Sequence, residues 1–199
     1  HDVGHYPFAH SLEAIHRASG QRPDTPRHEN LAAKVITGSL ADTLESALGV
    51  DPARVARLIT VPHAAQPTPL DSVLASSLSS GLDVDKMDYL ERDSTHLGVP
   101  YGRSFDVGRL LESLRLDEAG RKVAVAARGK IPAEMFVFSR YMMFSEVYWH
   151  HTVRSVSAMV QASLADVLPA LGSGPEVEAF LLGTSDDAFL AWIAQSAPP

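Results

Sequence analysis

The chain has 199 residues, of which 45% are hydrophobic, and this favours a packed core of one sizeable domain or two small ones. Its formal charge of −7 disfavours a generally basic nucleic-acid surface, and no apolar run approaches the roughly 20 residues that a membrane span needs. Cysteine is absent, which fits a cytoplasmic location and leaves histidine nitrogens and carboxylate oxygens as ligands for any metal.

Apolar residues recur at three- and four-residue intervals along most of the chain, and this spacing predicts a mostly α fold. We expect a helical body up to about residue 100, followed by a smaller α+β or helical continuation. The intervals are clearest at 31–40, 73–78, 110–114, 153–164 and 180–193.

Three aspartates indicate helix starts, because each can accept hydrogen bonds from first-turn amides. Asp51 precedes Pro52, Asp71 precedes SVLASSL, and Asp106 precedes VGRLLESL. Only KVAVAA, at 122–127, predicts a short strand, and helix is expected to resume near residue 133. Segments rich in proline and glycine predict connections at 21–28, 61–70, 95–104 and 171–176.

The first cluster of chemically active residues opens the chain as HDVGHYPFAH, residues 1–10. His1 and Asp2 are adjacent and offer one nitrogen and one oxygen ligand. Such a pair can hold a hard or borderline divalent ion without sulfur. By itself, the dipeptide is weak evidence for a metal site.

His10 falls in the first turn of the next expected helix and shares a face with Glu13, three residues on. A carboxylate beside an imidazole favours its protonated form and fixes its orientation, as a general acid acting near pH 7 requires. For His5 we expect a polar structural role around the loop.

The second cluster is PRHEN, residues 26–30, which places His28 and Glu29 at the entrance to a helix. A glutamate in a first turn suits the helix dipole, and a lone histidine there is usually solvated. Taken by itself, this cluster therefore favours an ordinary helix start over a site.

The third cluster is GLDVDKMDYLERDSTHLGVPYG, residues 81–102. On a helix, Asp85, Tyr89 and Asp93 form one stripe at four-residue spacing, with Lys86 beside it. Two carboxylates and a phenol on one helix face are poorly suited to an apolar core. The alternative to a site is a solvated face on which Lys86 and Arg92 form salt bridges.

Further along the chain, Arg140, Phe144 and Tyr148 recur at the same four-residue spacing, so one helix face can present a guanidinium and aromatic rings. Arginine suits phosphate because its planar donors bind two oxygens at once. Phe144 is expected to pack rather than to bind.

Together, HDVGHYPFAH, RHEN and GLDVDKMDYLERDSTHLGVPYG resemble, in order and separation, the HD-superfamily phosphohydrolases related to deoxynucleoside triphosphate triphosphohydrolases. That group includes bacterial dNTPases and the mammalian SAM-and-HD-domain triphosphohydrolase. The similarity continues through RYMMFSEVYWHHTVR and fades in the C-terminal tail. It implies an HD-domain helical bundle over residues 1–165 and a C-terminal helical segment over 166–199, part of a longer C-terminal region.

The resemblance implies a metal bound by an upstream histidine, an HD pair and a distant aspartate. His1 and Asp2 correspond to the pair, and Asp85 corresponds to the distant ligand. No helix precedes the pair, so we expect a chain truncated inside the metal site, which lacks the upstream histidine and shows little or no activity alone. The donor set accepts Mg, Mn, Fe, Ni, Co or Zn.

The resemblance also implies catalytic histidines. His10, with Glu13 as its acidic partner, and His28 correspond to the histidines near the phosphorus under attack. Spacing leaves open which of the two protonates the leaving oxygen.

Substrate-binding residues are implied in the same way. Lys86 corresponds to a lysine on the triphosphate. Asp93 corresponds to the carboxylate that accepts from the 3′-hydroxyl, and Tyr89 to the phenol that crowds the 2′ position of the sugar, an arrangement that rejects ribose. Arg140 and Tyr148 are further expected substrate ligands.

The implied activity is metal-dependent hydrolysis of deoxynucleoside triphosphates to deoxynucleoside and triphosphate. The expected partners are the nucleotide substrate, further copies of the chain in a homo-oligomer, and an allosteric nucleotide. Two alternatives stay open: an HD phosphohydrolase or phosphodiesterase for another nucleotide, and a nucleotide-binding regulator without turnover. Tyr89 and Asp93 favour the first activity, because a plain phosphodiesterase does not need a sugar-binding pair.

Overall fold

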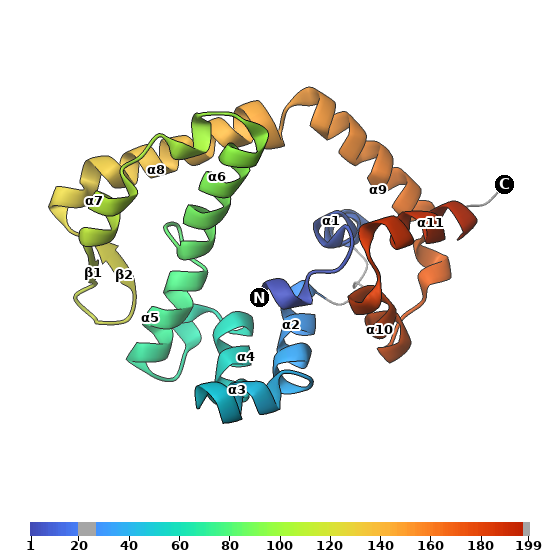
Figure 1. Cartoon of the computed structure of the whole chain (residues 1–199), viewed down its shortest axis with the longest axis horizontal. Coiled ribbons are helices and arrows are strands. Elements are labelled where there is room, and N and C mark those ends of the chain that lie inside the picture. Colours follow the sequence, from blue (N-terminus) through green and yellow to red (C-terminus); the bar gives the residue numbers. More distant parts are fainter. Residues whose placement is uncertain (20–26, 197–199) are drawn as a thin grey trace. The chain divides into compact units, whose positions relative to one another are not determined.

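The computed structural model describes residues 1–19 and 27–196, so most of the connection predicted at 21–28 lies outside the described residues. The chain divides into two compact units. The first unit combines His1–Thr60 with Arg154–Pro199, and the second is Val61–Val153. Each unit is described by itself, with the elements labelled as in Figure 1. The expected division at residue 165 stays a prediction.

Helices are the regular secondary structure of the first unit over its described residues. It begins with a short 3₁₀ helix, η1 (Asp2–Gly4), and its other elements come from both parts of the chain: α1 (Ala9–Ser19), α2 (His28–Thr37), α3 (Ala41–Leu48), α4 (Pro52–Thr60), α9 (His151–Leu171, from Arg154 onward), α10 (Pro175–Gly183) and α11 (Asp186–Ser196).

The main core of the first unit joins its two chain segments. Leu12 of α1 and Leu31 of α2 are fully buried in one cluster with Leu181 of α10 and Phe189 of α11. Burying an apolar side chain of this size contributes about 1.5–3 kcal/mol. A second cluster packs α2 against α4, through residues that include Ile36. Helix α2 therefore has apolar partners on two sides, which fixes the position of its N-terminal residue, His28.

The second unit contains four α-helices and a hairpin, ordered along the chain as α5 (Pro69–Leu78), α6 (Val84–Leu97), α7 (Val107–Glu112), β1 (Leu114–Leu116), β2 (Val123–Val125) and α8 (Lys130–Met143). It also has three short 3₁₀ helices, η2 (His63–Ala65), η3 (Tyr101–Arg103) and η4 (Ala127–Gly129). A π-helical segment, Phe144–Tyr148, follows α8 directly. The apolar core of the second unit is built from Leu90, Phe105, Leu110, Phe136 and Met143.

Two of the three predicted helix starts are confirmed. The Asp106 side chain caps α7 by accepting from the amide of Arg109 at 2.9 Å, and α4 begins at Pro52 directly after Asp51. The start predicted at Asp71 is wrong, because Thr68 caps α5 instead and Pro69 occupies the first helical position. Asp71 lies in the first turn, where its Oδ2 accepts from the Thr68 hydroxyl at 2.8 Å.

The strand predicted at 122–127 is confirmed as β2, which pairs antiparallel with β1. Leu114, which the periodicity assigns to the preceding helix, instead begins β1 and lies opposite Val125. The hairpin turn is held by Asp117, whose Oδ1 accepts from the amides of Arg121 at 2.7 Å and Lys122 at 2.9 Å. These hydrogen bonds hold the pKa of the Asp117 carboxyl below its usual value.

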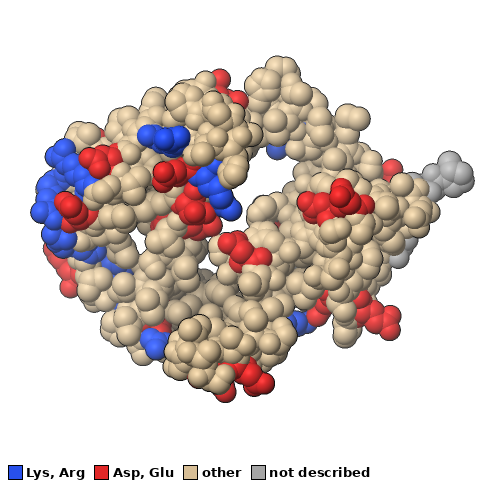
Figure 2. Space-filling model, in the orientation of Figure 1, with Lys and Arg blue, Asp and Glu red and all other residues tan. Residues whose placement is uncertain are grey.

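Charged side chains are unevenly distributed. Figure 2 shows Lys and Arg gathered over α7 and the hairpin, and acidic side chains over α10 and α11.

No helix in the described part of the chain has the length and apolarity needed to span a bilayer.

Candidate functional site

Histidine rings gather in the first unit, where η1, α1 and α2 meet. The rings of His5 and His28 stack with centroids 4.1 Å apart. The His10 ring lies 5.2 Å from each of them, in edge-to-face orientation. One ring nitrogen from each of these three residues falls within 4.8 Å of the others. The sequence separates His28 from the other two, and the packing of η1 on α2 brings them together.

Glu13 holds His28 in place. Its Oε1 lies 2.8 Å from Nδ1 of His28 and also accepts from the His28 backbone amide at 3.1 Å. Both side chains are nearly buried, with 12% of Glu13 and 9% of His28 exposed. Glu13 thus partners His28 and not His10, which corrects the pairing expected from helical spacing. The carboxylate favours a proton on Nδ1 and leaves Nε2 as the free ring nitrogen.

Two members of this cluster were not expected to carry chemistry. His5 stacks directly on His28, and burial, together with the neighbouring His28 and His10, lowers its pKa. Glu29 places Oε2 3.7 Å from Nδ1 of His28. Burial raises the pKa of Glu29, but its backbone hydrogen bond and the nearby His28 and Arg27 outweigh burial and lower it. The HEN tripeptide carried the signal for Glu29, since α2 begins with His28 and Glu29 side by side.

His1 and Asp2 lie close together at the start of the first unit. His1 Nε2 is 3.3 Å from Asp2 Oδ1, and the same oxygen is 3.5 Å from Nδ1 of His5. Two ligand atoms that are each about 2.1 Å from one ion lie about 3.0–3.4 Å apart, so the pair suits a shared cation. The donor set is nitrogen and oxygen, as borderline and hard divalent ions prefer.

The expected substrate residues lie in the second unit, mostly on α6. Asp83 caps this helix from a buried position by accepting from the Lys86 amide at 2.9 Å. Its Oδ2 also lies 2.6 Å from Lys86 Nζ, so Lys86, in the first turn of α6, forms a salt bridge with the capping residue. Arg92 pairs with Asp88 at 3.1 Å. Lys86 and Arg92 therefore do form the salt bridges expected of a solvated helix face. Their partners, Asp83 and Asp88, lie outside the Asp85–Tyr89–Asp93 stripe.

Asp93 and Tyr148, distant in sequence, are brought together. The Tyr148 hydroxyl donates to Asp93 Oδ2 at 2.7 Å, and the Tyr148 ring lies 6.3 Å from that of Tyr89. Burial and the Asp93 carboxylate raise the pKa of Tyr148 well above its usual value. Asp85 lies in the first turn of α6, half-buried.

Arg140 and Tyr148 do not share a regular α-helical face. Tyr148 lies in the π-helical segment, which has more residues per turn than an α-helix, so four-residue spacing no longer keeps side chains on one face. The Arg140 guanidinium lies 5.2 Å from the centroid of the Phe144 ring, within reach of a cation–π contact. Within the part of the chain that the structure describes, the buried Nε of Arg140 has no hydrogen-bond partner.

Replacing Tyr148 by phenylalanine is expected to lower the free energy of unfolding by about 1 kcal/mol, because Asp93 loses a donated hydrogen bond. Tyr148 has a raised pKa in the folded state, so its contribution is complete below its unfolded pKa near 10 and declines as pH rises above that value. The difference between parent and Y148F in urea unfolding should therefore narrow above pH 10. Y141F, an exposed control from α8, should match the parent throughout, and equal effects of both variants would contradict the assigned hydrogen bond.

Comparisons with known proteins point to one family. A family model described as the HD associated region matches residues 105–197. The chain is 32% identical over 162 residues to the uncharacterized protein YwfO of Bacillus subtilis, covering 80% of this chain and 34% of the relative. It is 27% identical over 162 residues to the putative HD domain-containing protein L394 of Acanthamoeba polyphaga mimivirus, with coverage of 81% and 34%.

A third relative has a named activity. The deoxynucleoside triphosphate triphosphohydrolase SAMHD1 of Gallus gallus is 25% identical over 183 residues, covering 80% of this chain and 30% of the relative. The chain therefore spans about a third of the length of the curated relatives that it matches.

Proposed function

We propose, from the premise that the chain belongs to the HD superfamily and resembles its deoxynucleoside triphosphate triphosphohydrolases, that it carries the site of a metal-dependent hydrolase for deoxynucleoside triphosphates. The products would be deoxynucleoside and inorganic triphosphate. The observation that carries the proposal is the cluster of His5, His10 and His28, in which buried His28 is held by Glu13.

A divalent metal ion is part of this proposal. His1, Asp2 and Asp85 are assigned as ligands of this chain, by the family pattern and by their nitrogen and oxygen donors. The spacing of the His1 and Asp2 donor atoms supports a shared ion. The ion would polarise a phosphoryl oxygen and lower the pKa of a bound water.

The proton transfers are assigned to the histidine cluster. Glu13 fixes the tautomer of His28, so Nε2 of His28 is the atom that holds or releases a proton. His10, on the exposed side of the cluster, is the second candidate. A positioned histidine of this kind contributes about 10²–10⁴ to a rate.

The nucleotide contacts are assigned to the second unit. Lys86 and Arg140 would neutralise phosphate charge, and the donor of Arg140 that lacks a partner among the described residues supports this role. Asp93 would accept from the 3′-hydroxyl, with its orientation set by Tyr148. Tyr89 would exclude a 2′-hydroxyl by its bulk. A homo-oligomer and an allosteric nucleotide complete the proposed partners.

The test is an assay of the protein that carries this chain against a panel of deoxynucleoside triphosphates, ribonucleotides and phosphodiesters. We expect deoxynucleoside and triphosphate to form in equal amounts, and a chelator to abolish turnover until Mn²⁺ or another divalent ion is added back. Asp2→Asn should remove the activity, whereas Asp42→Asn, an exposed change on α3, should not. Hydrolysis of other phosphoesters alone, or binding without product, would support the alternative functions and overturn this one.

A further inference from the structure

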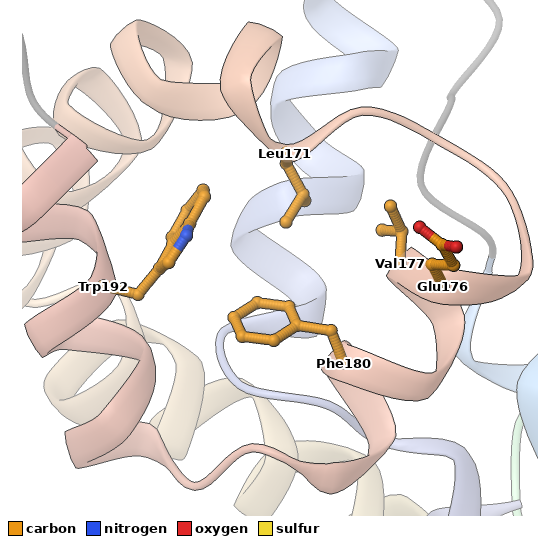
Figure 3. A pocket seen from close by; sticks show the side chains of 5 residues that line it. All are labelled: Leu171, Glu176, Val177, Phe180 and Trp192. Carbon is orange, nitrogen blue, oxygen red and sulfur yellow. The ribbon is translucent and has the colours of Figure 1, made fainter.

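The first unit contains an aromatic pocket that the proposed hydrolysis does not use. It has a volume of about 200 Å³ and lies between the end of α9, α10 and α11. Among the described residues its lining is mixed in chemistry, and Figure 3 shows these side chains: Leu171, Glu176, Val177, Phe180 and Trp192.

The two rings of the pocket form a corner. The centroids of Phe180 and Trp192 lie 5.7 Å apart with their planes at 57°, and Figure 3 shows the Phe180 ring directed toward the indole. Phe189 stacks on the indole at 5.5 Å with nearly parallel planes and holds it in orientation. Ring faces carry partial negative charge, and tryptophan attracts cations most strongly among the aromatic side chains.

The charge of this region favours a cation as well. From residue 155 to residue 199 the sequence has no lysine or arginine and five acidic residues. Glu178 is neutralised by Lys34, with Lys34 Nζ 2.6 Å from its Oε1. In the part of the chain that the structure describes, Glu176 has no basic partner, and Figure 3 shows it beside Val177 on the side of the pocket away from Trp192.

Pocket size and lining narrow the chemical class of the ligand. Pockets for drug-sized ligands have volumes of about 300–1,000 Å³, so this smaller pocket suits a small head group and not a nucleotide. A guanidinium brings five N–H donors, which Leu171 and Val177 cannot satisfy. A methylated ammonium has few or no donors and spreads its charge over methyl groups, which pack against both rings and aliphatic side chains.

We propose that Phe180, Trp192 and Glu176 form a binding pocket for a methylated ammonium group. The rings contact the methyl groups, and the carboxylate, on the opposite side of the pocket, supplies the opposite charge at longer range. This pocket and its ligand are independent of the proposed hydrolysis.

Intrinsic fluorescence tests the proposal directly. The chain has two tryptophans, so Trp149→Phe leaves Trp192 as the single reporter. Titration with choline, at constant ionic strength, should give a saturable change in emission. The neutral isostere 3,3-dimethyl-1-butanol has the same shape without the charge, and we expect it to bind about tenfold more weakly. Equal responses to choline and its isostere would overturn the proposal.

Two variants in the same background locate the ligand. Glu176→Gln, at an exposed position, should weaken choline binding about three- to tenfold without affecting the fold, because it removes the charge that attracts the cation. Phe180→Leu should weaken it further, whereas Glu118→Gln, in the hairpin turn, should leave it unchanged. Choline affinity unchanged in Glu176→Gln would overturn the proposal even if Phe180→Leu failed to fold.

A parallel titration with Nα-acetyl-trimethyllysine amide identifies the source of the group. Tighter binding of this compound than of choline supports a modified protein side chain as the ligand, and the reverse order supports a free small amine. A failure of both compounds to bind would overturn the proposal.

Discussion

Replacing Gly4 by alanine is expected to destabilise the first unit by about 3–5 kcal/mol, because the new methyl group has no space. A Cβ at Gly4 would lie 2.2 Å from the carbonyl oxygen of His28 and 2.3 Å from the backbone nitrogen of Ala32. Both are backbone atoms of α2, which is packed on its other sides and has little freedom to move. To relieve the clash between the new methyl group and the backbone of α2, η1 must separate from α2. This separation would carry His1 and Asp2 away from His28.

Urea unfolding followed by circular dichroism measures the loss of stability, and equilibrium dialysis with Mn²⁺ measures the loss of metal binding. Gly183→Ala is the matched control, because a Cβ at the end of α10 meets nothing within 4 Å. It should be neutral or slightly stabilising. An unfolding midpoint for Gly4→Ala equal to that of Gly183→Ala would contradict the close packing of η1 on α2.

The second large effect is expected from His28→Asn, which should lower kcat for deoxynucleoside triphosphates by about 10²–10⁴. The asparagine amide nitrogen takes approximately the place of Nδ1 and can still donate to Glu13, so the buried carboxylate keeps a partner. What the variant loses is the nitrogen at the Nε2 position, which holds the proton in the proposed mechanism. We therefore expect a folded protein that binds substrate and turns it over slowly.

Single-turnover assays on substrate-saturated enzyme measure this effect, and thermal unfolding checks the fold. Glu13→Gln should have a smaller effect on the rate, about 10- to 100-fold, because the neutral amide can still contact Nδ1 of His28 but no longer fixes its tautomer. His96→Ala, exposed in the last turn of α6, is the control for histidine loss. A rate for His28→Asn equal to that of His96→Ala would exclude His28 from the proton transfer.

The fold class was predictable because its signals are local. Asp106 and Asp51-Pro52 mark helix starts through hydrogen bonds and backbone preferences within a few residues, and the structure has helices at both positions. The helix start predicted at Asp71 was wrong for a local reason as well. Thr68, followed by Pro69, caps the same helix three residues earlier. Leu114 continues the apolar spacing of α7, but pairing with Val125 assigns it to a strand, and that partner is not adjacent in sequence.

The candidate site was predictable in its residue types and less so in its contacts. Helical spacing places Glu13 beside His10, but α2 brings His28 to the same carboxylate. The i, i+4, i+8 spacing of Arg140, Phe144 and Tyr148 assumes a regular helix, which ends at Met143. The Tyr148–Asp93 hydrogen bond spans 55 residues and has no signature in either segment. The ligand and substrate roles of the individual residues stay predictions.

The discontinuous make-up of the first unit has a consequence for how the protein acquires its structure. Residues 61–153 emerge from the ribosome as one uninterrupted stretch with an apolar core of their own, and we expect them to collapse early. The histidine-bearing segment is synthesised before this stretch, yet the apolar cluster that buries Leu12 and Leu31 also includes side chains of α9–α11. The native packing of this segment therefore waits until α9–α11 have been translated, and its apolar side chains are exposed to aggregation until then.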